Sequence, residues 1–542
     1  MNHFSKSLGA LLAGAVLCGC APLTLHVVAL NDFHGNLETN KMWQGPVAVQ
    51  AGGAETIAAA LQAWRREDPE LLLVGAGDLV SASPALSSMW ADEPTIGAMN
   101  LLGLRASALG NHEFDAGTRE LMRLQQGGCD SPRPDKACQF RPGFEGARFP
   151  YLAANVRDAA TGKLLVPAWR IEQAHGVKIG FIGAVTREAP ASIMASNTAG
   201  LSFADEADAI NGVLPELKAA GATVFVVLIH EGARDREAAS DCHDFKGPIV
   251  DIVKRLDPRI RLIVSGHSHM PYACQVDGRM VTQADMGGHM LTRIALTLDA
   301  RTREVTAVKA ANVLLEPGVH APDPAMTAFM AKVRERSTAA LARPVATLAV
   351  PSIRRKGNEA GESALGDLIA DAMLEATREL NVDVAFMNPG GIRKDLDAGT
   401  DLVLRYGQVQ AVQPFGNLVL VLEMTGAQLR ALLESQWTKG GDDKVLQVSR
   451  GFSYRWDAQA PYGQRVVAGS VMLNGAALDD RKTYRVAASN FLYGGGDGFT
   501  TFKEARKLVA PQLLDLDVLA TYLARQGKSA SADSAARIQR VN

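Results

Sequence analysis

The 542-residue sequence lacks the features that mark polytopic membrane proteins, nucleic-acid-binding proteins and disordered chains. Beyond the N-terminal segment, no apolar run reaches the roughly 18 residues that a membrane-spanning helix needs. Lysine and arginine number 56 against 58 acidic residues, without a basic stripe or an acidic tail, which argues against a nucleic-acid polymer as partner. No internal repeat or low-complexity tract occurs. A chain of this length with 47% hydrophobic residues is expected to form two unlike domains.

The first twenty residues have the pattern of a lipoprotein signal peptide. Lys6 and the amino terminus form a positive end, residues 8–17 are apolar but too short to cross a bilayer, and Cys20 closes the lipobox-like sequence Leu-Cys-Gly-Cys. Acyl chains on Cys20 would hold an exported protein at a membrane surface. Ala21 differs from the aspartate of an inner-membrane retention signal, so the outer membrane, facing the periplasm or the cell surface, is favoured. The alternative is an ordinary secretory signal cut nearby.

Four cysteines remain beyond this segment: Cys129, Cys138, Cys242 and Cys274. An even number in an exported protein favours disulfides, and four cysteines allow three connectivities. The local pairing of Cys129 with Cys138 and of Cys242 with Cys274 costs the least in loop closure. Because no Cys-x-x-Cys pair occurs among them, structural zinc is disfavoured.

Apolar runs and amphipathic stretches alternate up to about residue 318, which is typical of a layered α/β domain. Strands are predicted at residues 25–30, 71–75, 177–184, 223–229 and 262–264, and helices at 55–66 and 249–256. Residues 127–146, rich in proline, glycine and cysteine, are predicted to form an irregular loop.

Prolines and a glycine between residues 317 and 324 mark the end of this first region, and residues 325–342 have the pattern of a connecting helix. The second region restarts with a predicted helix at 363–380 and a strand at 382–387, and it ends with a helix at 513–524. We therefore divide the chain into a signal peptide at 1–20, a first domain at 21–320, a linking helix at 321–343 and a second domain at 344–542.

Polar side chains with metal-binding chemistry follow several of the strand-like runs. They are Asp32, His34, Asp78, Asn111, His230, His267 and His269. Because a parallel sheet gathers the carboxyl ends of its strands at one edge, these side chains are expected to meet there. Asp78, preceded by a glycine, is the candidate bridge between two cations. Oxygen and imidazole ligands suit Mn²⁺, Zn²⁺, Co²⁺, iron or Mg²⁺, and two such ions side by side are a device for displacement at phosphorus.

His112 and Asp115 have a separate predicted role beside this set. His112 follows the candidate ligand Asn111, so it lies at the metal centre without having to bind the metal. An imidazolium there protonates a leaving oxygen or stabilises phosphate, and Asp115, three residues on, orients it and favours its charged form. The alternatives are that His112 is one more ligand or a packed core residue.

The motifs Asn-Asp-Phe-His at 31–34, Gly-Asp at 77–78, Gly-Asn-His-Glu at 110–113 and Gly-His-Ser-His at 266–269 resemble, in this order, the calcineurin-type metallophosphoesterases. The whole chain after the signal segment is similar to the 5′-nucleotidase family, which includes UDP-sugar hydrolases. The resemblance implies a four-layer α/β metallophosphoesterase domain, a linking helix and an α+β C-terminal 5′-nucleotidase domain. It also implies that Asp32, His34, Asp78 and His269 hold one metal, that Asp78, Asn111, His230 and His267 hold the other, and that His112 and Asp115 are the catalytic dyad.

The C-terminal half carries three more family-like segments, Asn388–Arg393, Gln413–Asn417 and Asn490–Gly498. By resemblance, the substrate-binding residues there are Asn388, Arg393, Phe415, Asn417, Phe491 and Asp497. Arginine suits phosphate groups, and two phenylalanines accept any nucleobase by stacking. The resemblance assigns the stacking to Phe415 and Phe491 and the ribose hydroxyls to Asp497.

The sequence departs from the family pattern before the first C-terminal helix, where members usually carry further substrate-binding arginines. Here residues 357–363 contain none, and the nearest are Arg354 and Arg355, several residues upstream. Either an inserted loop returns one of them to the pocket, or the pocket holds less positive charge. The preferred phosphate chain length therefore stays open. Pro389, where the family often has glycine, is expected to reshape the loop beside Arg393.

The functional hypothesis is an extracytoplasmic dimetal hydrolase of nucleotides, a 5′-nucleotidase that also accepts UDP-sugars or other nucleoside diphosphate derivatives. In it, a metal-bound hydroxide attacks phosphorus. The alternatives are a 2′,3′-cyclic-nucleotide phosphodiesterase with 3′-nucleotidase activity, a sulfur-compound hydrolase of related fold, and a non-catalytic surface binding protein on the same scaffold. The metal and the oligomeric state are not fixed by the sequence.

Overall fold

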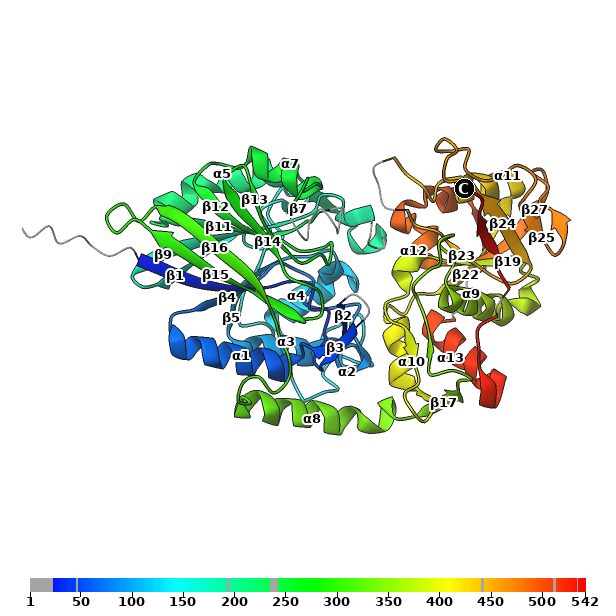
Figure 1. Cartoon of the computed structure of the whole chain (residues 1–542), viewed down its shortest axis with the longest axis horizontal. Coiled ribbons are helices and arrows are strands. Elements are labelled where there is room, and N and C mark those ends of the chain that lie inside the picture. Colours follow the sequence, from blue (N-terminus) through cyan, green and yellow to red (C-terminus); the bar gives the residue numbers. More distant parts are fainter. Residues whose placement is uncertain are drawn as a thin grey trace, which may run out of the picture.

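The computed structural model describes residues 23–44, 47–191, 193, 195–233, 242–439, 443–509, 513–533 and 535–542. The predicted signal peptide and Cys20 lie outside these residues. The chain forms two lobes, and helix α8 (Pro324–Leu341) runs beneath the first and ends at the second (Figure 1). Within the described residues, no helix is long and apolar enough to cross a membrane.

Two six-stranded sheets build the first lobe. One has the order β16-β15-β1-β4-β5-β6 and the other the order β13-β14-β12-β11-β9-β8. The first consists of β1 (Leu23–Leu30), β4 (Leu72–Gly75), β5 (Leu104–Ala108), β6 (Tyr151–Leu152), β15 (Met290–Leu298) and β16 (Val305–Leu314). The second consists of β8 (Trp169–Ala174), β9 (Val177–Val185), β11 (Val224–His230), β12 (Ile260–Val264), β13 (Tyr272–Val276) and β14 (Arg279–Gln283).

The strands that precede the candidate ligands are parallel in each sheet: β1, β4 and β5 in one, and β11 and β12 in the other. Of these, β4 is entirely apolar and β11 is apolar up to His230, as strands covered on both faces must be. An apolar layer between the sheets joins β1 and β4 of one to β9, β11 and β12 of the other. The parallel centres therefore direct their carboxyl ends to one edge of the sandwich.

Helices cover the outer face of each sheet, giving four layers. Helices α1 (Ala54–Glu67), α3 (Glu93–Leu102), α4 (Gly117–Gln126) and α8 share a core with the first sheet, and α5 (Glu206–Ala219) and α7 (Pro248–Arg255) share one with the second. The short helix α2 (Ala85–Ser88) lies between β4 and α3 in the chain. The predicted four-layer α/β fold is confirmed.

Helix α8 packs against the first lobe. The Asp323 side chain caps its N-terminus by accepting a hydrogen bond from the Met326 amide at 2.8 Å. Met326, Met330 and Val333 are buried in the core of the first sheet's helical layer. The linking helix is therefore a fixed extension of the first lobe.

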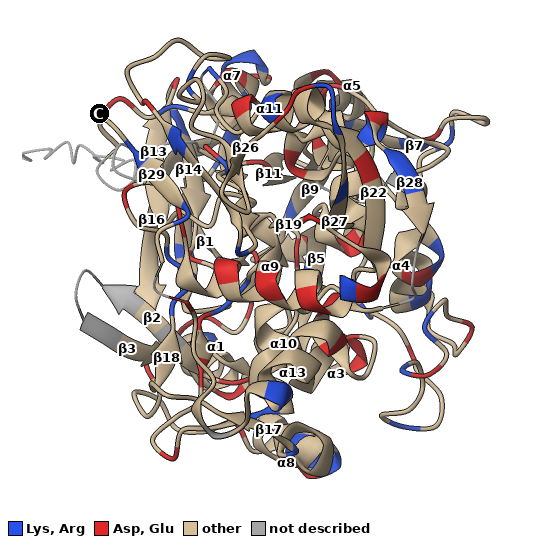
Figure 2. Cartoon of the chain, turned by 90° about the vertical axis from the view of Figure 1, so that its right-hand side faces the viewer, with Lys and Arg blue, Asp and Glu red and all other residues tan. Residues whose placement is uncertain are grey.

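A five-stranded sheet of order β23-β19-β27-β22-β28 is the centre of the second lobe. Its strands are β19 (Val384–Met387), β22 (Val419–Thr425), β23 (Gln447–Val448), β27 (Thr483–Ser489) and β28 (Arg506–Val509). One core holds α9 (Ala364–Ala376), α10 (Tyr406–Val412) and α13 (Asp515–Gln526), and another holds α11 (Gly426–Glu434) and α12 (Asn490–Tyr493). Figure 2 shows acidic and basic residues interspersed over this end of the molecule, with acidic positions along α9.

The remaining strands form small sheets at the margins. Four make the sheet β26-β25-β24-β29: β24 (Phe452–Trp456), β25 (Met472–Leu473), β26 (Ala476–Ala477) and β29 (Ile538–Arg540). The others pair as β2 (Asn40–Gln44) with β3 (Val47–Ala51), β7 (Val156–Asp158) with β10 (Leu201–Phe203), β17 (Pro344–Thr347) with β21 (Val403–Arg405), and β18 (Ser352–Ile353) with β20 (Leu396–Asp397).

Both disulfides are the local ones. Of the three connectivities left open, the structure forms Cys129–Cys138 and Cys242–Cys274, with sequence separations of 9 and 32. The first closes part of the predicted irregular loop, which contains no helix or strand. That loop is therefore closed by a disulfide and not by strand pairing.

Candidate active site

The seven predicted metal ligands all lie where parallel strands end. Asp32 and His34 follow β1, Asp78 follows β4, Asn111 follows β5, His230 is the last residue of β11, and His267 and His269 follow β12. Asp32, His34, Asp78, His267 and His269 have φ between 45° and 78°. Such left-handed conformations in non-glycine residues are costly and gather at functional sites. The backbone here turns sharply so that the side chains converge.

Asp78 and Asp32 form the centre of the cluster. His230 Nε2 lies 3.0 Å from Asp78 Oδ2, and His34 Nε2 lies 3.6 Å from the same oxygen. His269 Nε2 lies 3.3 Å from Asp32 Oδ1. Three sets of potential ligands overlap here: Asp32 with His34 and His269, Asp32 with Asp78 and His230, and His34 with Asp78 and His112.

Asn111 joins the same centre. Its Oδ1 lies 3.1 Å from His230 Nε2 and 3.0 Å from His267 Nδ1. The amide oxygen and both imidazoles thus point at one place, as expected for the second ion's ligands. The structure brings all seven predicted residues together.

The donor set fits divalent cations. His34 Nε2 is buried and has no hydrogen-bond partner within the described residues, while its Nδ1 faces the Ser81 carbonyl oxygen at 3.0 Å. Likewise His230 Nδ1 faces the Ala76 carbonyl oxygen at 2.7 Å. A backbone partner on one ring nitrogen fixes the tautomer and leaves the other nitrogen for a metal. Burial, partly offset by Asp78, holds the pKa of His34 well below its usual value, so the ring is neutral, as a ligand must be.

Two glycines make room for this convergence. A Cβ on Gly110 would lie 2.1 Å from Asp78 Oδ1. A Cβ on Gly77, whose φ is +87°, would lie 2.7 Å from His230 Nδ1. Only glycine allows the neighbouring backbone to approach the carboxylate and the imidazole this closely.

Glu113 organises the loops beneath the ligands, a role that the sequence analysis missed. Its carboxylate accepts hydrogen bonds from the backbone amides of Asp78 at 2.9 Å, Leu79 at 2.8 Å and Gly110 at 2.6 Å. It is 3% exposed. One buried side chain therefore fixes the loop after β4 to the loop after β5. The only signal in the sequence was an acidic residue between histidine and phenylalanine, a pattern that also fits a surface turn.

His112 and Asp115 form the predicted pair on a single 3₁₀ turn, η1 (His112–Phe114). His112 Nδ1 lies 2.7 Å from Asp115 Oδ2. Burial opposes a charged imidazole, but Asp115 and Asp78 outweigh it and raise the pKa of His112. The His112 ring lies 5.0 Å from the His34 ring, between their centroids. A proton donor is thus held beside the metal ligands.

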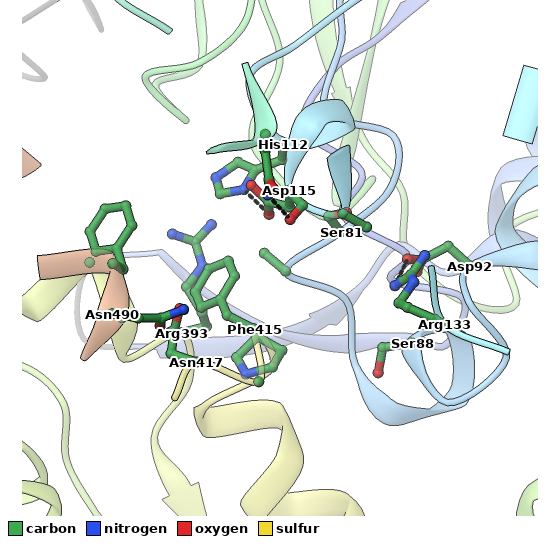
Figure 3. Close-up of a pocket in the computed structure, with 18 of the residues that line it drawn as sticks. Ser81, Ser88, Asp92, His112, Asp115, Arg133, Arg393, Phe415, Asn417 and Asn490 are labelled. Atoms are coloured by element: carbon green, nitrogen blue, oxygen red, sulfur yellow. Dashed lines mark hydrogen bonds and ion pairs between the residues drawn. The ribbon is translucent and has the colours of Figure 1, made fainter. Parts of the chain in front are cut away.

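A cavity of about 380 Å³ lies between the two lobes and contains residues from both. The first lobe contributes His112 and Asp115. The second contributes all six predicted substrate-binding residues, Asn388, Arg393, Phe415, Asn417, Phe491 and Asp497. Figure 3 shows Arg393 and Phe415 facing the His112–Asp115 pair. The volume falls within the range of small-molecule sites.

The two lobes touch at the dyad and at two further hydrogen bonds. The Phe415 ring stacks on His112 with centroids 5.8 Å apart and planes inclined by 20°. The Arg393 guanidinium lies 5.8 Å from the centre of the Phe415 ring. Lys394 Nζ donates to Asn36 Oδ1 at 3.2 Å, and Gln410 Nε2 donates to Ser88 Oγ at 2.6 Å. The arginine predicted to bind phosphate therefore sits at the side of the metal cluster.

Two partly buried hydrogen bonds hold the predicted nucleoside-binding side chains. Asn388 Nδ2 donates to Asp497 Oδ2 at 2.7 Å, and Asn417 Nδ2 donates to Asp515 Oδ2 at 3.1 Å. Burial raises the pKa of Asp515 to about 7. Asp515, which opens α13, was not a predicted site residue. Its acidic side chain at a helix start has the appearance of an ordinary first-turn residue in the sequence.

The upstream arginines do not line the cavity. Arg355 Nη1 donates to the Arg393 carbonyl oxygen at 2.7 Å, and Arg354 Nη1 pairs with Asp395 at 3.1 Å. They support the segment that carries Arg393 from behind. Pro389 begins a 3₁₀ turn, Pro389–Gly391, immediately before that segment. Of the two possibilities left open, the cavity follows the second: in the described residues its C-terminal lining carries Arg393 but neither Arg354 nor Arg355.

Comparisons with known proteins agree with this architecture. The family model for calcineurin-like phosphoesterases matches residues 25–271, and the model for the 5′-nucleotidase C-terminal domain matches residues 344–504. The crystal structure of a 5′-nucleotidase precursor from Thermus thermophilus superposes with a TM-score of 0.78 at 28% identity, covering 96% of this chain and 100% of that one.

Two curated relatives extend the comparison. The 5′-nucleotidase of Vibrio cholerae is 25% identical over 569 residues, covering 95% of this chain and 94% of that protein. The endonuclease YhcR of Bacillus subtilis is 31% identical over 473 residues, covering 86% of this chain but 37% of that longer protein.

The sandwich with its metal-ligand cluster defines a metal-dependent phosphoric ester hydrolase of the calcineurin-like class, whose members use two divalent metal ions. The match of residues 344–504 to the 5′-nucleotidase C-terminal domain identifies the family within this class. The chain belongs to the 5′-nucleotidase family.

Proposed function

We propose that the protein hydrolyses nucleoside 5′-phosphates, and nucleoside diphosphate derivatives such as UDP-sugars, outside the cytoplasm. The observation that carries this proposal is the shared cavity. It is lined by a proton donor beside the metal-ligand cluster and by the Arg393 guanidinium. Two phenylalanines, Phe415 and Phe491, and the Asp497 carboxylate line it as well. These are the groups that phosphate, a base and a ribose require.

Each side chain has a role in the proposal. Asp32, His34, Asp78 and His269 hold one cation, and Asp78, Asn111, His230 and His267 hold the other. When bound, these ions activate water and neutralise phosphate oxygens. The identity of the metals is left to experiment.

The remaining groups act on the substrate itself. Arg393 holds phosphate oxygens, and His112 donates its proton to the leaving oxygen while Asp115 keeps the ring oriented. Phe415 and Phe491 stack on the base, and Asp497 accepts hydrogen bonds from ribose hydroxyls. Asn388 and Asn417 complete the polar lining on that side.

The domain division and the location belong to the proposal as well. We assign residues 21–320 to the metal-binding domain, 321–343 to the linker and 344–542 to the substrate-binding domain. Export is supported by the two disulfides, which form in oxidising compartments. It is also supported by similarity to a protein named as a cell wall protein in Listeria monocytogenes, 29% identical over 558 residues. Lipid attachment at Cys20 and an outer-membrane location remain our proposals for the anchor.

A substrate panel tests the proposal. The purified mature protein, loaded with Mn²⁺, is given AMP, UDP-glucose, 2′,3′-cyclic AMP and p-nitrophenyl phosphate, and the products are identified by chromatography. We expect adenosine from AMP and UMP or uridine from UDP-glucose. Preferred opening of the cyclic nucleotide would point to the cyclic phosphodiesterase alternative, and turnover of p-nitrophenyl phosphate alone would contradict the nucleoside-binding assignment.

A further inference from the structure

The cavity has a second arm that the nucleotide assignments do not use. Figure 3 places Ser88, Asp92 and Arg133 on the opposite side of Phe415 from Asn417 and Asn490. All line the same cavity. These three residues come from the first lobe, from the segment after β4 and from the disulfide-closed loop, and Gln410 of the second lobe donates to Ser88 Oγ at 2.6 Å.

This arm begins at the metal-ligand cluster. Ser81, which also lines the cavity, accepts through its carbonyl oxygen from His34 Nδ1 at 3.0 Å. A substrate phosphate at the metals therefore has the nucleoside-binding side chains on one side and this arm on the other. A group attached to the phosphate opposite the nucleoside would enter the arm.

Asp92 supplies a buried acceptor in the arm. The residue is 1% exposed and has a left-handed φ of 62°. Its Oδ1 accepts from Ser87 Oγ at 2.8 Å, whereas its Oδ2 has no hydrogen-bond partner among the described residues. A buried carboxylate oxygen that accepts no hydrogen bond is costly even with a guanidinium 3.8 Å away, which points to a ligand that donates to it.

Arg133 supplies donors beside that acceptor. Its Nη2 donates to Glu120 Oε1 at 2.8 Å, and its Nη1 lies 3.8 Å from Asp92 Oδ2. The buried Nε makes no hydrogen bond to any described residue. The guanidinium is thus anchored through Nη2, and its Nε–H is left to donate to a ligand.

The loop that carries Arg133 is fixed in place. The disulfide Cys129–Cys138 closes it, Ser131 Oγ donates to Glu120 Oε2 at 2.6 Å, and the Cys138 amide donates to Glu93 Oε1 at 2.7 Å. A loop held at three points presents its arginine without an ordering cost on binding.

The charges of the arm select its ligand. Asp92, Glu93 and Glu120 face Arg123 and Arg133, and Lys136 also interacts with Asp92 and Arg133, so the network balances three acids against three bases. It therefore offers no net positive charge to a second anion. Hydroxyl groups suit it better, because they can donate to Asp92 and accept from Arg133.

We propose that this arm binds a hydroxyl-rich, uncharged group, such as a hexose, attached to the phosphate on the side away from the nucleoside. The inference rests on the proposed function and adds Asp92 and Arg133 as specificity-determining residues. It distinguishes nucleoside diphosphate sugars from nucleoside monophosphates, which leave the arm empty.

The test compares kcat/KM for UDP-glucose with kcat/KM for UMP in the full mature protein. Asp92→Asn and Arg133→Ala are each expected to lower the UDP-glucose to UMP ratio by about tenfold to a hundredfold, the value of a hydrogen bond to a charged group. The matched control is Arg119→Ala, which removes an exposed arginine paired with Asp130 near the same loop. Its ratio should stay at the wild-type value.

Each outcome has a separate meaning. If wild-type protein hydrolyses neither substrate, the proposed function fails. If it hydrolyses UMP but not UDP-glucose, the arm has no such role and the proposed function is reduced to nucleoside monophosphates. If both variants keep the wild-type ratio, the arm has no such role and the proposed function stands. Should Arg133→Ala not fold, as a melting curve would show, Asp92→Asn carries the test. An increase in the inhibition constant of glucose 1-phosphate for either variant gives an independent readout.

Discussion

The two lobes solve different problems with different parts of the chain. In the first, the candidate ligands follow buried parallel strands and are fixed by backbone contacts, such as the carbonyl partners of His34 and His230. In the second, the substrate-binding side chains lie on loops and short turns, and Asn388 and Asn417 are held by other side chains. The candidate catalytic groups lie on the rigid scaffold, and the candidate substrate-binding groups lie on loops, whose sequences vary more freely.

This contrast has a consequence for mutants. A change at the strand ends should remove catalysis for every substrate, because it alters the metal centre. A change in the second lobe should alter binding of particular substrates and leave the metal centre intact. Three predictions test this division, and a fourth concerns the stability of the second lobe.

Replacing Asp78 should have the largest effect. Asp78 lies 3.0 Å from His230 and 3.6 Å from His34, at the centre of the cluster. We expect Asp78→Asn to lower kcat by about 10³-fold or more on all substrates, because bound cations supply several kcal/mol of transition-state stabilisation. Metal content by mass spectrometry should fall in parallel. The control His320→Gln changes a histidine outside the site and should retain both; equal losses in the two variants would contradict the assignment.

Replacing His112 should come next. His112→Ala is expected to lower kcat by about 10²–10⁴-fold while the protein keeps its metals, since the residue donates a proton without acting as a ligand. Asp115→Asn, which weakens the 2.7 Å contact to the ring, should have a smaller effect in the same direction. Loss of metal from His112→Ala would instead support the alternative that His112 is a ligand, as the set of His34, Asp78 and His112 allows.

Replacing Phe491 should affect recognition and not chemistry. We expect Phe491→Ala to raise KM for AMP by about tenfold to a hundredfold, because stacking contributes about 1–3 kcal/mol per base. The kcat for p-nitrophenyl phosphate, which has no nucleobase, should change little. Phe491 is a cleaner test than Phe415, whose ring also stacks on His112. A similar loss on both substrates would show that the second lobe is not separable from the chemistry.

The smallest effects on activity are expected in α9 of the second lobe, where substitutions change stability instead. Asp371 receives two hydrogen bonds from Arg537, at 2.8 and 2.9 Å, so Asp371→Asn should destabilise the protein by about 3–5 kcal/mol. Asp367, one turn earlier, has a pKa raised to about 8, mainly by burial, which Arg537 only partly offsets. Asp367→Asn should therefore stabilise the protein.

The pH dependence separates these two aspartates. Folded Asp367 keeps its proton up to about pH 8, whereas the unfolded residue loses its proton near the ordinary pKa of 3.8. The free energy of unfolding therefore falls as the pH rises between these two values. Asp367→Asn should flatten that decline in denaturant titrations from pH 5 to about 8. A decline as steep as in the wild type would contradict the assignment.

The sequence predicted the scaffold and the convergence of the candidate ligands because both depend on regular features. The apolar runs of β1, β4, β9, β11 and β12 mark buried strands, and polar residues after them fall at one sheet edge. The linking helix and the irregular loop were also predicted.

Several features of the site depend on contacts between distant segments, and these escaped the sequence. Glu113 is defined by the amides of Asp78, Leu79 and Gly110, which no local pattern reveals. Arg133 lies in a loop that lacks periodicity, and only the fold brings it beside Asp92. Arg355 was a candidate for the pocket, but its bond to the Arg393 carbonyl oxygen directs it elsewhere.

The most direct test of the account is phosphate release from AMP by the mature protein, measured after metal removal and again after Mn²⁺ is restored. We expect turnover that disappears with chelation, returns with the metal, and is about 10²–10⁴-fold lower in metal-loaded His112→Ala. Turnover that survives chelation would contradict the two-metal centre. Metal-loaded protein that releases no phosphate from AMP would contradict the nucleotidase assignment.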